Sequence, residues 1–149
     1  MARLAAAVAA FALALAPAAC GDGGDESADE FREGYNSALA QLGRVSSDLA
    51  ESDAGDQSNR EIAADFERFA DTWQTTRADL SELTPPEDAR DEFDELLTAL
   101  DQGIADLRAA ARAARSDDPE GFAEARESLS ESGREIADAE DALKDAVGD

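Results

Sequence analysis

The chain has 149 residues, of which 36 are acidic, 13 are basic and none is histidine, and its formal net charge is −23 at pH 7. A surface this negative repels nucleic acid and anionic lipid headgroups, which excludes both as ligands of a folded domain. Without histidine or a second cysteine the chain also lacks the commonest general base, most nucleophile–base pairs and most transition-metal sites. We therefore expect one domain with no enzymatic activity and no cofactor.

Residues 1–19 have the layout of a signal peptide. A cationic start at Arg3 is followed by the apolar run 4–16 and by small residues that lead to Cys20, the only cysteine. The run is shorter than the roughly 20 residues that a helix needs to cross a bilayer. The segment therefore predicts export from the cytoplasm and contributes nothing to the fold.

The ending Leu15-Ala16-Pro17-Ala18-Ala19-Cys20 resembles the lipobox of bacterial lipoproteins. The resemblance implies that Cys20 is acylated with palmitate-type chains, that signal peptidase II cuts before it, and that the protein sits on the extracytoplasmic face of the cell membrane. Pro17 occupies a position where that family usually has an aliphatic residue. The alternative is an ordinary secretory signal cut after Ala18, which would leave Cys20 as a free thiol.

Residues 20–27 form the next unit, a lipidated cysteine and a glycine-rich acidic tether that spans at most about 25 Å when extended. The tether lacks the residue order of an EF-hand calcium loop. Ser27 and Glu30 fit a helix capping box, so the sequence predicts a helical domain over residues 28–149.

Apolar residues at spacings of three and four predict the first two helices of this domain. The first helix ends in the turn-rich segment 52–56. The second begins at a capping box of Ser58 and Glu61 and is stopped by Thr84-Pro85-Pro86. The predicted buried faces are Phe31, Tyr35, Ala38, Leu42, Val45 and Leu49, then Ile62, Phe66, Phe69, Trp73, Thr76, Leu80 and Leu83.

The third and fourth helices show the same periodicity. Acidic residues crowd the first turns of the third helix from Glu87 onward, where the helix dipole favours them. Asp118 as N-cap and Pro119 at the first helical position open the fourth. The predicted buried faces are Ala89, Phe93, Leu96, Leu100, Ile104, Leu107, Ala111 and Ala114, then Phe122, Ala125, Leu129, Ser132, Ile136, Ala139, Leu143 and Ala146.

Four helices joined by short connections predict an all-α fold, an antiparallel up-down-up-down four-helix bundle about 40 Å long. The sustained heptad spacing favours coiled-coil-like crossing. The segment Leu83-Thr84-Pro85-Pro86-Glu87, followed by an acidic amphipathic helix, is similar to linkers in helical lipoproteins of Gram-positive bacteria. This second resemblance implies no activity.

Three glycines, Gly43, Gly103 and Gly133, fall near the middles of their helices at the level of Trp73. The simpler interpretation is that they let neighbouring helices close around the indole ring. The alternative is a pocket for a small apolar ligand, with Trp73, Phe69, Leu42, Leu100 and Ile136 as its walls.

Two charged clusters have paired interpretations as well. The acidic start of the third helix suits a weak divalent-cation site, or else it is a solvated helix end; its residues are Glu87, Asp88, Asp91, Glu92 and Glu95. The arginines of that helix suit either an anionic ligand or ion pairs with the facing fourth helix; these are Arg108, Arg112 and Arg115, opposite Glu120, Glu124 and Glu127.

The serines Ser81, Ser128 and Ser130 have no base partner in the sequence pattern and are predicted to lie on helix surfaces. The function favoured by these observations is a membrane-anchored, non-catalytic envelope lipoprotein that acts as a helical interaction module. Its expected partners are the membrane, through the lipid on Cys20, and an envelope protein that the sequence does not identify. Binding of a small apolar ligand or a divalent cation by the bundle is the alternative.

Overall fold

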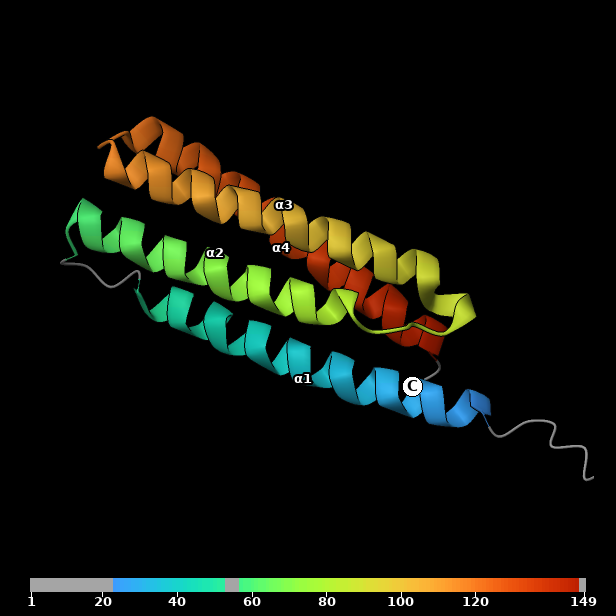
Figure 1. The fold of residues 1–149 in the computed structure, drawn as a ribbon. Coiled ribbons are helices and arrows are strands. Elements are labelled where there is room, and N and C mark those ends of the chain that lie inside the picture. Colours follow the sequence, from blue (N-terminus) through green and yellow to red (C-terminus); the bar gives the residue numbers. More distant parts are fainter. Residues whose placement is uncertain (1–22, 53–56, 148–149) are drawn as a thin grey trace, which may run out of the picture.

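The computed structural model describes the backbone of residues 23–52 and 57–147 and the side chains of residues 28–44 and 57–147. Within these ranges the chain forms four α-helices and one short 3-10 helix and contains no strand. The helices lie side by side as a helical bundle (Figure 1). The predicted all-α class is confirmed. The predicted signal peptide, Cys20 and the first residues of the tether lie outside the described residues.

Helix α1 spans Gly23–Ser52. The predicted start beside Ser27 is wrong, because the helix already begins at Gly23 and includes most of the predicted tether. Asp25 and Glu26 lie in this first stretch, where the helix dipole stabilises carboxylates. Their stabilisation acts against the cost of about 1 kcal/mol that a helical glycine carries.

Helix α2 spans Asn59–Ser81 and opens with the predicted capping box. The Glu61 carboxylate accepts from the Ser58 backbone N–H at 2.8 Å, and Ser58 Oγ accepts from the Glu61 N–H. The bonds from the Ser58 side chain and backbone lower the pKa of Glu61. The helix ends before Pro85 and Pro86, as predicted from the missing proline N–H and the steric restriction before proline.

The next segment departs slightly from the prediction. Glu87–Ala89 forms a separate 3-10 turn, η1, and helix α3 follows over Arg90–Arg115. Helix α4 spans Pro119–Val147. Its predicted cap is confirmed, because Asp118 Oδ1 accepts from the Gly121 N–H at 3.0 Å.

One hydrophobic core joins all four helices. Most of its members belong to the predicted faces, whereas Ala70, Ala99 and Ala110 were not predicted. The predicted core residues Val45 and Leu49 lie outside the residues whose side chains are described. Phe31 of α1 meets Phe93 of α3 edge-on with ring centroids 5.4 Å apart, and Phe66 of α2 meets Phe122 of α4 at 5.6 Å. Aromatic pairs in this geometry add to the stabilisation from burial. A few predicted core residues, Phe122 among them, are only partly buried at the edges.

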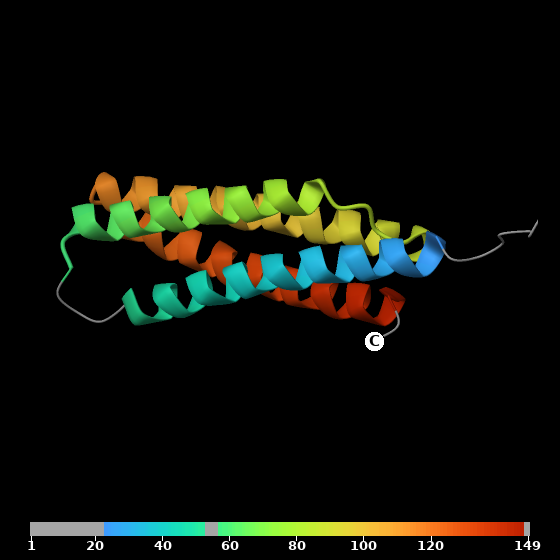
Figure 2. The same ribbon diagram turned by 60° about the horizontal axis from the view of Figure 1, so that its bottom comes forward.

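Contacts between chain-distant residues define the two ends of the bundle. At one end Arg32, near the start of α1, donates from Nη2 to the carbonyl oxygen of Val147, the last residue of α4, at 2.6 Å. At the other end Asn59, the first residue of α2, donates to Asp117 after α3 at 2.6 Å. Figure 2 shows the same arrangement, with the start of α1 beside the end of α4.

None of the described helices has an apolar stretch long enough to cross a membrane.

Candidate functional site

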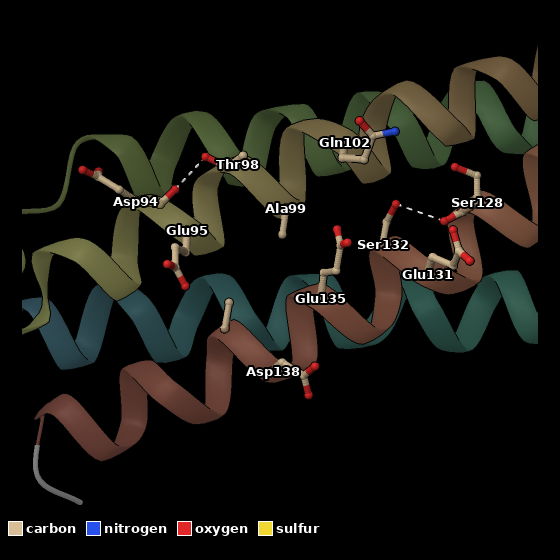
Figure 3. A pocket seen from close by; sticks show the side chains of 11 residues that line it. Asp94, Glu95, Thr98, Ala99, Gln102, Ser128, Glu131, Ser132, Glu135 and Asp138 are labelled. Atoms are coloured by element: carbon tan, nitrogen blue, oxygen red, sulfur yellow. Dashed lines mark hydrogen bonds between the residues drawn. The ribbon is translucent and has the colours of Figure 1, made fainter.

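The described surface has a groove between α3 and α4 (Figure 3). We call it the acidic groove. Its volume is about 790 Å³. The lining residues are Asp94, Glu95, Thr98, Ala99 and Gln102 of α3 and Ser128, Glu131, Ser132, Glu135, Asp138 and Ala139 of α4.

The charges of the acidic groove have one sign. Five of the eleven lining residues are acidic and none is basic. Helical spacing explains the arrangement, because Glu131, Glu135 and Asp138 follow one another at four and three residues and so share a face of α4. Over seven residues this row extends about 10 Å along the helix. Small side chains, including Ala99 and Ala139, also line the groove.

A buried carboxylate lies behind one end of the acidic groove. Asp106 of α3 is only 6% exposed. Its Oδ1 accepts from Gln102 Nε2 at 3.0 Å and from Ser128 Oγ at 2.9 Å, and its Oδ2 accepts from Ser132 Oγ. Gln102, Ser128 and Ser132 also line the groove, so they separate Asp106 from it.

This carboxylate is unusual because its partners are neutral. Buried charges in proteins are normally paired with an opposite charge or bind a metal ion. Among the described residues, the hydrogen-bond partners of Asp106 are one amide and two hydroxyls, and it forms no ion pair. At this end of the acidic groove, a buried carboxylate therefore lies behind the carboxylates that line the surface.

Sequence reasoning missed this cluster. Ser128 was predicted to lie on the helix surface without a partner; it is half-buried and donates to Asp106. The available signal was Asp106 itself, which lies three residues after Gly103 and one before the buried Leu107, on the apolar side of the third helix. Ser132, which was predicted to be buried, is 2% exposed and completes the cluster.

Arg108 and Arg115 of α3 pair with α2, and this corrects the prediction that they pair with α4. Arg115 Nη2 lies 2.6 Å from Glu67 Oε1, and Arg108 Nη2 lies 3.9 Å from Asp71 Oδ1. A third pair along the same seam joins Arg77 to Asp101 through two bonds of 2.9 and 3.0 Å. The heptad pattern gives the buried face of α3 but not the side on which each neighbour lies.

The five residues predicted to wall an apolar pocket belong to the common core. Trp73, Phe69, Leu42, Leu100 and Ile136 are all buried. None of them lines the acidic groove or two smaller hollows, one around Arg68 between α1 and α2 and one around Arg77 between α2 and α3.

Of the three mid-helix glycines, only Gly103 lies against the indole ring. A Cβ atom built on Gly103 would stand 2.5 Å from Trp73 Cζ3 and 3.5 Å from Ile136 Cδ1. Gly43 and Gly133 have no such neighbour within 4 Å and are exposed. The prediction that all three close around Trp73 is wrong for two of them, because those two point outward from the bundle.

The predicted cation site is not assembled as a chelating group. The described residues contain no set of three or more Asp, Glu, His or Cys side chains placed to hold one metal ion. The 3-10 turn takes Glu87 and Asp88 out of the regular path of α3. Of the five predicted ligands, only Glu95 lines the acidic groove. The carboxylates of the groove are likewise too dispersed for a single ion.

Comparisons with protein-family models, with curated protein sequences and with solved structures found no match.

Proposed function

We propose that this protein is a lipid-anchored, non-catalytic interaction module of the bacterial cell envelope. The observation that carries the proposal is the N-terminal sequence, in which a short apolar run and small residues lead to the only cysteine, Cys20. The helical bundle begins at Gly23, so an anchor on Cys20 would hold the bundle close to the membrane surface. The strong negative charge of the chain gives the bundle itself no attraction to anionic lipids.

We further propose that the four helices have the antiparallel up-down-up-down topology. The bond from Arg32 to Val147 supports it by joining the start of α1 to the end of α4. The bond from Asn59 to Asp117 supports it by joining the start of α2 to the end of α3. In this topology the lipid anchor lies at the end of the bundle that carries Val147, and the acidic groove runs along its flank.

The non-catalytic role is supported by the chemistry of the groove. The two serines of its lining donate to a carboxylate rather than to a basic nitrogen, so neither has a base that would activate it as a nucleophile. The alternative function, in which the bundle binds a small apolar ligand or a divalent cation, rests on sequence patterns alone. Surface complementarity to another protein is the use that the described groove fits best.

The anchor is tested by mass spectrometry of the mature protein purified from bacterial membranes. We expect an acylated N-terminus at Cys20 and a membrane-bound protein. Cys20→Ser should move the protein from the membrane fraction to the soluble fraction, whereas Ser27→Ala, a nearby matched change, should leave it membrane-bound. An unmodified N-terminus at Ala19 would instead establish cleavage after Ala18 and would overturn the anchor.

A further inference from the structure

We propose that the acidic groove is the docking surface of this module and that its occupant is a basic segment of a partner protein. The inference rests on the proposed interaction function and names the chemistry of the partner. It does not depend on acylation of Cys20.

The first step of the argument is charge complementarity. The acidic groove brings five carboxylates to one concave surface without a basic residue among the lining side chains. On the neighbouring seam between α2 and α3, by contrast, arginines already pair with carboxylates, as in Arg77–Asp101 and Arg115–Glu67. The carboxylates between α2 and α3 are therefore paired with arginines of the protein itself, whereas no basic residue lines the groove between α3 and α4. A cationic occupant would relieve the mutual repulsion of the groove carboxylates.

The second step is the buried Asp106, an observation independent of the rim. A carboxylate that is 6% exposed and hydrogen-bonded only to neutral donors is a charge without a counter-charge among the described residues. Gln102, Ser128 and Ser132 stand between it and the groove. A lysine or arginine head group that entered at this end would lie one side-chain layer from Asp106 and would supply the missing positive charge.

The third step is the extended shape of the charge pattern. The described carboxylates form no group able to hold a metal ion, which argues for several cationic groups spread along the groove. Glu131, Glu135 and Asp138 repeat at four and three residues on α4. A helical segment with lysine or arginine at the same repeat would match this row.

The test is a titration of the full chain, purified in a mild non-ionic detergent, with a fluorescent alanine-based peptide of about 15 residues that carries lysine at helical spacings of three and four. We expect saturable one-to-one binding that an otherwise identical glutamate peptide does not show. The double variant Glu131→Gln/Glu135→Gln should weaken binding about tenfold, as expected for two lost charge contacts.

The matched control is Glu124→Gln/Glu127→Gln. It removes the same charge from exposed positions of the same helix that do not line the groove. We expect less than about a twofold effect, because distant charges act only through screened long-range attraction. Equal weakening by the two double variants, or the absence of saturable binding, would overturn the proposal.

Spermine, used as a competitor, separates a protein segment from a free polyamine. Displacement of the peptide only at spermine concentrations far above the peptide Kd supports a protein partner, and binding of spermine as tight as that of the peptide overturns it. Failure of the peptide titration leaves the lipid anchor untouched, and an unacylated Cys20 leaves the groove assignment untouched, so the two proposals fail separately.

Discussion

Helix α3 has two seams, one where it contacts α2 and one where it contacts α4, and they differ in how their charges are paired. On the α2 side, exposed arginines and carboxylates face one another across the helices, with Arg77–Asp101 as the best-formed pair. On the α4 side, neutral residues donate hydrogen bonds to a buried carboxylate, Asp106, and all charged residues that line the groove are acidic. One seam balances its charges at the surface, and the other leaves an excess of negative charge along a groove. The difference shows that ion pairing among the described residues of α3 is concentrated on the side that faces α2.

The largest effect is expected from breaking the polar cluster of the α4 seam. Ser132→Ala removes a hydroxyl that donates to Asp106 and leaves that buried carboxylate short of a partner. The expected loss in the free energy of unfolding is about 2 kcal/mol. Urea denaturation followed by Trp73 fluorescence and circular dichroism measures it.

Ser130→Ala is the matched control for this change, since Ser130 is exposed on the same helix. It should alter the free energy of unfolding by no more than about 0.5 kcal/mol. Similar small values for both variants would mean that the Asp106 cluster contributes little to stability.

The next largest effect is expected at two glycines, where replacement by alanine should change the stability in opposite directions. Gly103→Ala places a methyl group against the rigid indole of Trp73, where the seams meet. Overpacking is expected to outweigh the gain in helix propensity and to destabilise the protein by about 1 to 2 kcal/mol.

Gly133→Ala has open space around it and should stabilise the protein by up to about 1 kcal/mol through helix propensity alone. Thermal unfolding of the two variants and the parent measures both changes in stability. A stabilised Gly103→Ala would show that the indole shifts at little cost.

These cases also show what sequence reasoning can reach. The buried faces and the caps at Ser58 and Asp118 followed from helical periodicity and from the unpaired N–H groups of helix starts. Both are confirmed within the described side chains. Both signals are local, so one helix at a time is enough to see them. The start of α1 was missed because two glycines and a run of acids are equally typical of a tether.

The sequence did not predict which helix lies on which side of α3. An amphipathic pattern fixes which side of a helix is buried but leaves two mirror-related ways to place the other helices around it. The prediction for Arg108 and Arg115 failed for this reason, since they turned to α2. The acidic groove and the role of Ser128 escaped for the same reason, because both depend on which faces of α3 and α4 meet.

A smaller effect is expected on the ion-paired seam. A double-mutant cycle on Arg77→Ala and Asp101→Ala should give a coupling energy of about 0.5 to 1 kcal/mol, the range for a well-formed exposed pair. This coupling should fall as sodium chloride is raised to about 1 M. The stability of the whole protein should rise over the same range, because its net charge of −23 is screened. Coupling that grew with salt would contradict the assignment of this seam as electrostatic.

The smallest effect concerns the other side of α4, where Glu140 is half-buried. Burial is the main cause that raises the pKa of Glu140, with Asp141 adding to it and Lys144 opposing it.

Because the folded-state pKa lies above the unfolded one, the contribution of Glu140 to stability is fully present below the ordinary carboxyl pKa of about 4.3 and is lost as pH rises through the raised value. Glu140→Gln cannot ionise, so it should be more stable than the parent near pH 7, and the gap should narrow as the pH falls towards 4. Thermal unfolding across this range, with the exposed Glu135→Gln as control, measures the gap. A stability difference that stayed constant with pH would show that packing, and not ionisation of Glu140, causes the difference between the variant and the parent. The destabilising negative charges of α4 would then be those that line the acidic groove.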